Sequence, residues 1–267
     1  MYRKFIELIA PYWPDNNRLE RIWLFAKIDF RRRYYDSFLG LFWALINPLF
    51  KMGLYYLVFT ILFSSQIENF ALYIFVGLIN WMFFSEISSK GIRLFRQKSY
   101  LIETIDFPRE DIFISSTLSG VLGLLFNFGA FFLMLFLFGG SINVQILWLP
   151  VLLINLLIFT YSVSLVLGVF SIYLKDIDHL WDMLILAGFW SIPIFWDQNI
   201  LFGEGRIDLL LYLNPITGIV TNMRYVLLEG LPPKISWLLY DLAYSFIFLL
   251  ATSVFFKQKN HLAAEKI

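Results

Sequence analysis

Lys51 carries a positive charge near the middle of the first long apolar run of this chain. Asn47 and Tyr55 lie about one helical turn before and after it, so the three polar side chains share one face of a helix. A cation that faces lipid inside a bilayer costs about 3 kcal/mol or more, so this face should meet other helices or a water-filled path. The alternative is a span that begins later, with Lys51 reaching back to the head groups.

Sequence motifs for catalysis or nucleotide binding are absent from the chain. No G-x-x-x-x-G-K-[ST] motif occurs, so the chain lacks the loop that cradles nucleotide phosphates. It has no cysteine, and its two histidines, His179 and His261, lie far apart in the sequence. The run Asp176-Ile177-Asp178 matches a short metal-nucleotide pattern of some sugar transferases, but capping of the helix that follows is the better interpretation. We therefore expect no enzyme activity, no metal site and no cofactor in this chain.

The composition indicates an integral membrane protein. Apolar residues make up 59% of the chain, charged residues 15%, and the mean hydropathy is +0.70. Soluble domains carry about 25% charged residues, and a soluble core does not need repeated apolar runs of about 20 residues. We predict an all-α membrane domain at 37–256 with six transmembrane helices, which fall near 38–63, 70–89, 112–138, 146–173, 179–196 and 236–256.

Lysine and arginine residues are concentrated on one side of such a six-span arrangement. Residues 1–36, the loop 90–110 and the tail 257–267 hold most of them, whereas the other side has only Arg206, Arg224 and Lys234. This bias places both termini in the cytoplasm, and an odd number of spans would break it. The N-terminal segment also lacks a continuous apolar stretch, so we expect no cleaved signal peptide.

The N-terminal segment contains a predicted amphipathic helix. Asn17 and Glu20 have the spacing of a capping box, which marks a helix start. The basic residues after them lie largely off an apolar face that is formed by Leu19, Ile22, Trp23, Ala26 and Phe30. Such a helix can lie in the membrane interface or dock a cytoplasmic partner, and the sequence leaves both open.

The segment 199–231 on the outer side is not an ordinary linker. It is too apolar for free solvation, and Asn214-Pro215 and Gly218 interrupt it too much for a single crossing helix. We predict two short re-entrant helices that dip into the outer leaflet. A gate and a plain pair of interfacial helices fit this pattern equally well.

Aromatic residues form 20% of the chain. Trp81, Trp190 and Trp196 lie near predicted span ends, where tryptophan commonly sits at the head groups. Aromatic faces also suit sugar rings, whose C–H faces are apolar and whose edges carry hydroxyls. Composition alone favours the interfacial role.

Short motifs, in order along almost the whole chain, resemble those of one family. The first runs from Arg33-Tyr34 through Trp43 to Pro48, and the second is Phe107-Pro108-Arg109-Glu110. The others are Tyr173-Leu174-Lys175-Asp176-Ile177, Pro193-Ile194, and Asn214-Pro215 followed by Arg224 and Gly230. The set resembles the membrane subunit of type-2 ABC polysaccharide exporters, which move O-antigen, capsule or teichoic-acid chains. Lys175 stands where the family has arginine, which keeps the charge but loses the planar fork of a guanidinium.

The resemblance implies an ATP-driven exporter of lipid-linked polysaccharide in the bacterial cytoplasmic membrane, with this chain as its permease. Two copies would form a homodimer around a channel and would dock two copies of a separate ATPase subunit, which binds ATP and Mg. The implied partners are thus a second copy, the ATPase, the lipid-linked polysaccharide and membrane lipid, and not nucleic acid. Export of a drug or another lipid by a related permease is the alternative, followed by a membrane enzyme that modifies lipid-linked sugars.

The resemblance also implies roles for particular residues. The first and fifth spans would line the channel with Asn47, Lys51, Tyr55, Phe59, Phe189, Trp190 and Trp196. The entry helix and the loop 90–110 would contact the ATPase through Arg31, Arg32, Arg33, Arg93, Arg96, Arg109 and Glu110. The short helices of 199–231 would close the outer mouth around Asn214, Pro215 and Arg224.

Overall fold

The computed structural model describes residues 17–34, 40, 42–61, 67–105, 107–198, 212 and 214–259, and these residues form helices and no strand. The helices are α2 (Arg18–Tyr34), α3 (Phe42–Ile61), α4 (Phe70–Gln97), α5 (Ser99–Thr104), α6 (Glu110–Leu137), α7 (Leu149–Tyr173), α8 (Ile177–Ser191), α10 (Pro215–Arg224) and α11 (Ile235–Lys259). A 3₁₀ turn, η2 (Val144–Trp148), precedes α7, and a π-helical turn, η5 (Tyr225–Glu229), follows α10. The first part of the predicted outer pair, 199–211, lies outside the described residues, as do the ends of the predicted N-terminal and C-terminal segments.

Five helical segments among the described residues are long and apolar enough to cross a membrane. They are α3, α4, α6, η2 together with α7, and α11. Apolar runs of this length satisfy every backbone hydrogen bond within the helix, which is the condition for crossing lipid. The chain is therefore an all-helical, multi-pass membrane protein.

The fifth predicted span, at 179–196, corresponds to a shorter helix. Helix α8 has 15 residues, which gives a length of about 22 Å at 1.5 Å per residue. From Ile192 to Trp196 the chain is no longer helical. A hydrocarbon core is about 30 Å thick, so α8 alone does not span it.

Helix α4 extends well beyond its predicted apolar run of 70–89. The segment 90–110, predicted as a charged loop, is helical as far as Gln97 and again in α5. The physical reason is that Leu94 and Phe95 are buried in a cluster with residues of α6, α7 and α11, and that Ile92 is buried in another cluster with residues of α7. The charged residues between them therefore do not end the helix.

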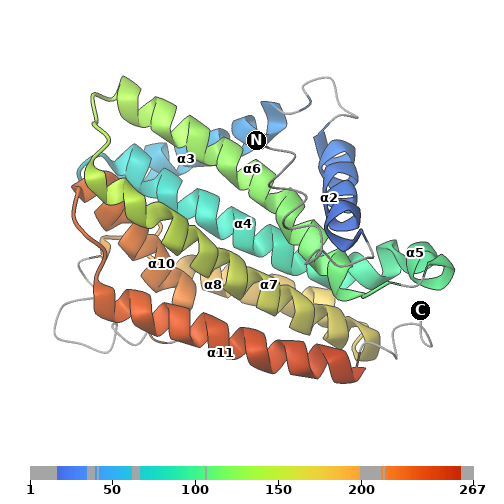
Figure 1. The fold of residues 1–267 in the computed structure, drawn as a ribbon. Helices are drawn as coiled ribbons and strands as arrows, with labels where there is room; N and C mark the ends of the chain where they lie inside the picture. Colours follow the sequence, from blue (N-terminus) through green and yellow to red (C-terminus); the bar gives the residue numbers. More distant parts are fainter. Residues whose placement is uncertain are drawn as a thin grey trace, which may run out of the picture.

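Helices α4 and α7 form the centre of the bundle. The apolar window of α4 is 78% buried and that of α7 is 61% buried, against 11% for α3 and 22% for α11. Figure 1 shows α4 and α7 side by side, with α6 along one edge and α11 along the other. At Gly91 a Cβ atom would lie 2.7 Å from the carbonyl oxygen of Ser164, so the glycine allows close approach of the two backbones. Helices α3 and α11 lie at the periphery of the bundle, and most of their apolar surface is not covered by the rest of the chain.

Helix α2 crosses the long helices steeply, near one end of the bundle (Figure 1). Its Ile22 and Ala26 are buried and it packs on α6, whereas Leu19 and Trp23 of the predicted apolar face are half exposed. The end of α11 and the short α5 lie at the same end. The described basic residues of the predicted cytoplasmic segments therefore gather at one end of the molecule.

Candidate functional site

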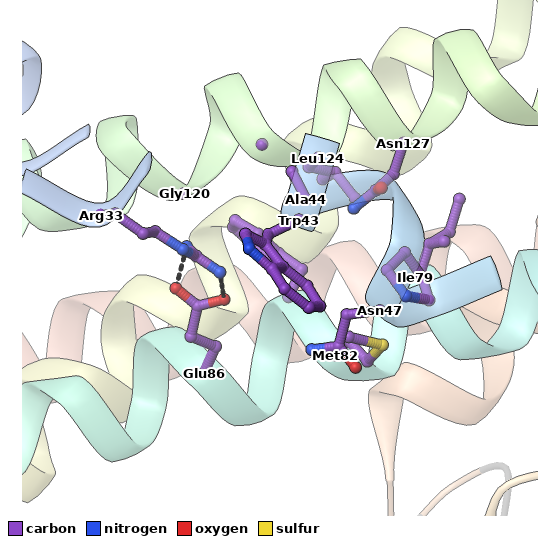
Figure 2. Close-up of a pocket in the computed structure, with 13 residues that line it drawn as sticks. Arg33, Trp43, Ala44, Asn47, Ile79, Met82, Glu86, Gly120, Leu124 and Asn127 are labelled. Atoms are coloured by element: carbon purple, nitrogen blue, oxygen red, sulfur yellow. Dashed lines mark hydrogen bonds and ion pairs between the residues drawn. The ribbon is translucent and has the colours of Figure 1, made fainter. Parts of the chain in front are cut away.

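An open cavity of about 340 Å³ lies between α3, α4 and α6. Six of the side chains around it carry the argument: Arg33, Trp43, Asn47, Glu86, Leu124 and Asn127. Figure 2 shows Trp43 and Asn47 on α3 approaching the cavity from one side, with Glu86 on α4 opposite Arg33. We refer to it as the tryptophan cavity. It brings together Asn47, predicted for the channel, and Arg33, predicted for ATPase contact.

The start of α3 is shaped so that Trp43 and Asn47 face this cavity. Gly40 has a φ of 48°, a left-handed conformation that favours glycine, and its carbonyl accepts from the N–H of Trp43 at 3.3 Å. Pro48 lies inside the helix and lacks an N–H to donate to the carbonyl of Ala44. Ala44 and Pro48 are also the buried residues of α3. The turn that lacks this hydrogen bond is therefore the part of the helix that packs against the bundle.

An ion pair between Arg33 and Glu86 closes one side of the tryptophan cavity (Figure 2). Arg33 belongs to the last turns of α2, and Glu86 belongs to α4. The two side chains are 35% and 36% exposed, so the pair contributes about 0–1 kcal/mol. Its importance is geometric, because it joins the interface helix to a wall of the cavity.

The polar atoms of the tryptophan cavity suit a neutral hydroxylated ligand. Asn127 has a buried Oδ1 without a hydrogen-bond partner among the described residues, and Asn47 is exposed at the cavity. Trp43 adds an apolar face, the usual surface for the C–H side of a sugar ring. Among the described residues, no group of three or more histidine, aspartate or glutamate side chains could hold a metal ion. The arrangement can bind and orient a ligand.

Several of the predicted ATPase-contact residues form ion pairs within the chain. Arg93 and Arg96 of α4 donate to the two carboxylate oxygens of Asp178 in α8, at 3.1 and 3.0 Å. Glu110 lies 3.9 Å from Arg18, and Arg31 and Arg32 are exposed at the end of α2. Arg109 precedes α6 directly. Asp178 thus joins α4 to α8, a role that the sequence did not reveal.

Asp111 is a second functional candidate that sequence reasoning missed. It is fully buried at the start of α6 and accepts from Arg18 at 2.8 Å and from Arg21 at 2.7 Å. Its only sequence signal was an acidic residue in the first turn of a helix, which is common and unspecific. The pairs fix the first half of α2 to α6.

Four of the predicted channel residues meet around Phe195, a residue that was not predicted. The ring centroids of Tyr55 and Phe59 on α3 lie 4.6 and 4.9 Å from that of Phe195. Those of Phe189 and Trp190 on α8 lie 5.1 and 5.6 Å from it. The two predicted wall helices therefore touch through an aromatic cluster.

The other two predicted channel residues lie apart from this cluster. Lys51 is partly exposed on α3 and lines neither the tryptophan cavity nor the aromatic contact. The carbonyl of Trp196 accepts from the Tyr73 hydroxyl at 3.0 Å, so the backbone there is held by α4.

Arg224, predicted at the outer mouth, is fully buried inside the bundle. Its guanidinium donates to the carbonyl of Tyr73 at 3.0 Å and to those of Pro193 and Ile194. It also lies over the Tyr73 ring, 3.4 Å from the centroid. The carbonyls of Pro193 and Ile194 belong to the non-helical run after α8, so the arginine provides donors where a helix would have provided them.

The remaining two outer residues start the helix that carries Arg224. The Asn214 side chain accepts from the N–H of Ile216 at 3.1 Å, and Pro215 takes the first helical position. All residues of α10 are buried. Helix α10 of the predicted outer pair is thus packed within the bundle.

Comparison with known proteins identifies the family. The ABC-2 type transporter family matches residues 20–228. The O-antigen export system permease protein RfbA of Myxococcus xanthus is 25% identical over 239 residues, which cover 90% of this chain and 92% of that protein. The protein of the same name in Klebsiella pneumoniae is 24% identical over 203 residues, covering 76% and 78% of the two chains. Because the family match extends over most of the chain, this protein belongs to the ABC-2 type transporter family.

Proposed function

We propose that this protein is the permease subunit of an ATP-driven exporter that moves lipid-linked polysaccharide of the O-antigen type across the bacterial cytoplasmic membrane. Relatives over 90% and 76% of its length are O-antigen export permeases. Its sequence has no nucleotide-binding loop, so a separate ATPase subunit would carry ATP and Mg. Two copies of each subunit would form the transporter.

The observation that carries this proposal is the position of α2. Asp111 holds its first half to α6, and the Arg33–Glu86 pair joins its last turns to α4. Helices α4 and α6 are also two walls of the tryptophan cavity, which contains Asn47. A cytoplasmic subunit that pushes on α2 would therefore move the walls of a ligand cavity.

The channel would be lined by α3 and α8, with the basic end of the bundle in the cytoplasm. These two helices are little enclosed: the apolar window of α3 is 11% buried, the lowest among the five candidate spans, and α8 has no buried residue. A second copy of the chain would cover such faces. The aromatic cluster around Phe195 would offer ring faces to passing sugars without specific hydrogen bonds.

The outer end would be closed by α10 and the segment after α8. Arg224 holds these two elements together, and Asn214 with Pro215 fixes the start of α10. The fifth of six membrane crossings would be completed by α8 and the non-helical run after it.

Deletion of the gene in its own organism tests the function. We expect loss of a surface polysaccharide with accumulation of the lipid-linked polymer inside the cell, and restoration by the intact gene. Co-purification with a tagged copy should recover an ATPase subunit. Unchanged surface polysaccharide would contradict the proposal, and modification of lipid-linked sugars by the purified chain alone would favour the enzyme instead.

A further inference from the structure

A second open cavity, of about 870 Å³, lies beside the tryptophan cavity at the basic end of the bundle. It is bounded by the end of α2, the last turns of α4, and α8, and five cationic residues line it: Arg32, Arg33, Lys90, Arg93 and Lys98. We refer to it as the basic cavity. It shares Arg33 and Glu86 with the tryptophan cavity, so the ion pair between them separates the two spaces.

Carboxylates do not balance the cations of the basic cavity. Among the described residues, Asp29 and Glu86 are the acids that line it, and Asp178 pairs with Arg93 from outside the lining. Five cations thus face three carboxylates. Such an excess in a partly enclosed space attracts anions.

Two lysines share a single carboxylate in this cavity. Lys98 donates to Oδ1 of Asp29 at 2.6 Å, whereas the ammonium of Lys90 lies 3.8 Å from Oδ2 of the same residue. That distance is longer than a hydrogen bond, and Oδ2 has no partner among the described residues. Asp29 is buried, and the Lys90 side chain is 27% exposed. Lys90 therefore has donors to offer to an anion in the cavity.

The basic cavity lies where helix α4 leaves the apolar layer. The predicted apolar run of this helix ends at residue 89, directly before Lys90, and Ile185 of α8 adds an apolar wall. Phosphate groups of lipids occupy this level of a membrane. The mixture of arginine forks and lysine ammoniums suits phosphate oxygens, which accept charge-assisted hydrogen bonds from both.

We propose that the basic cavity binds the diphosphate head group of a membrane lipid, with the first sugar of that lipid in the tryptophan cavity. The identity of this lipid as the polysaccharide carrier rests on the proposed function; the binding of a diphosphate amphiphile does not. Trp43, Asn47 and Asn127 lie on the far side of the Arg33–Glu86 pair, where a group attached to the diphosphate would extend. An acidic segment of a protein partner fits the same charges less well, because the site is a hollow at head-group level.

Binding by the full-length chain in phosphatidylcholine nanodiscs tests the proposal. The probes are geranylgeranyl diphosphate, geranylgeraniol, which lacks the phosphates, and inorganic diphosphate. We expect the lipid diphosphate to bind at least about tenfold more tightly than either of the others, because only it combines charge with an apolar tail. Equal affinity for inorganic diphosphate would overturn the lipid assignment, and absence of binding by every probe would overturn the site.

Substitutions of lining residues test whether the bound group lies in the basic cavity. Lys90→Gln and Arg32→Gln should each weaken binding of geranylgeranyl diphosphate about tenfold. The matched control, Lys257→Gln, removes a charge from the exposed end of α11 and should leave the affinity unchanged. Ser89→Asp adds an opposing charge to the lining without removing an ion pair, so it tests the site if a lysine variant does not fold.

The outcomes separate this site from the proposed function. Suppose that Lys90→Gln weakens binding, but deletion of the gene leaves surface polysaccharide unchanged. The lipid-binding site would then be supported, and the proposed export function would be rejected. Normal binding in all cavity variants, together with lost recovery of the ATPase, would instead assign the basic cavity to a protein partner and overturn the proposal.

Discussion

At the scale of single residues, Arg224 and Asp111 each connect separate elements of the fold. Arg224 is the largest fully buried side chain among the described residues. Its guanidinium donates hydrogen bonds to three carbonyls, which belong to two other elements. Asp111 is equally buried and is shared by two arginines of α2. A buried charged group is stable only when it is paired or hydrogen-bonded, so both positions are sensitive to substitution.

Replacement of Arg224 should lower the thermal stability of the purified protein. In Arg224→Met three carbonyl contacts are lost, and each buried group left unpaired costs about 1–3 kcal/mol. Arg224→Lys should fall between that variant and the wild type, because an ammonium lacks the planar fork and the stacking on Tyr73. Thermal unfolding in detergent measures both. A melting temperature of Arg224→Lys equal to that of the wild type would contradict the role described for the guanidinium.

Replacement of Asp111 should destabilise the protein more than replacement of Glu86. Asp111→Asn removes a fully buried carboxylate that pairs with two arginines, whereas Glu86→Gln breaks a pair that is over a third exposed, worth about 0–1 kcal/mol. We also expect faster tryptic cleavage at Arg31–Arg33 in Asp111→Asn, since α2 would detach from α6. Equal stability and equal cleavage of the two variants would show that Asp111 does not hold the helix.

Removal of the Lys51 charge should affect transport rather than folding. Lys51 is partly exposed on the least enclosed long helix, and it was predicted to face the channel. We expect Lys51→Leu to be expressed and folded normally but to restore less surface polysaccharide in a deletion strain. Wild-type export by this variant would place Lys51 away from the channel.

At the scale of elements, short α10 is the least ordinary part of the fold. It is buried along its whole length, although the segment 199–231 that contains it was predicted to lie on the outer side. Gly218 allows this position, because a Cβ atom there would lie 2.1 Å from Oδ2 of Asp241 on α11. The contact of α10 with α11 therefore depends on a missing side chain.

Gly218→Ala should destabilise the protein, and a second substitution should relieve the effect. The added methyl group must displace α10 from α11 or move the Asp241 carboxylate. In Gly218→Ala combined with Asp241→Ala the obstructing carboxylate is absent, so the double variant should be more stable than the sum of the single effects. Thermal unfolding of the four proteins gives the coupling. Additive effects would mean that the two residues do not collide.

Much of the element order could be predicted from the sequence, because apolar runs of membrane length are nearly sufficient for a helix. The short α8 could not, since the residues 179–196 are largely apolar and only Pro193 hints at the break. The pairs of Asp111 and Asp178 could not be predicted either. Their partners are remote in the sequence, and each acid also has the ordinary position of a first-turn residue.

The candidate site was predictable in part for a similar reason. Arg33 and Asn47 were singled out separately, one for its charge and the other for its place in an apolar run. Their meeting at one cavity depends on how α2 folds back across α4, which no local pattern encodes. Phe195 went unnoticed because one more phenylalanine in an aromatic-rich chain carries no signal of its own.

At the scale of the whole molecule, the described basic residues of the predicted cytoplasmic segments gather at one end, and α10, which carries Arg224, lies toward the other (Figure 1). An excess of lysine and arginine at one end is the pattern expected when that end faces the cytoplasm. The absence of cysteine makes this orientation directly measurable.

Single cysteines should report opposite sides of the membrane. Ser141 and Lys175 are both exposed, in the connections that follow α6 and α7. With an impermeant maleimide, Ser141→Cys should be labelled in intact spheroplasts and Lys175→Cys only after lysis. Labelling of Lys175→Cys in intact spheroplasts would reverse the proposed orientation.

The Arg33–Glu86 ion pair lies between the tryptophan cavity and the basic cavity. It borders both cavities, and a pair so exposed contributes about 0–1 kcal/mol, comparable with thermal energy. Rotation of either side chain would join the two spaces into one, without movement of a helix. A ligand that offers its own anion to Arg33 would take the place of Glu86, so its arrival would itself open the passage to Trp43.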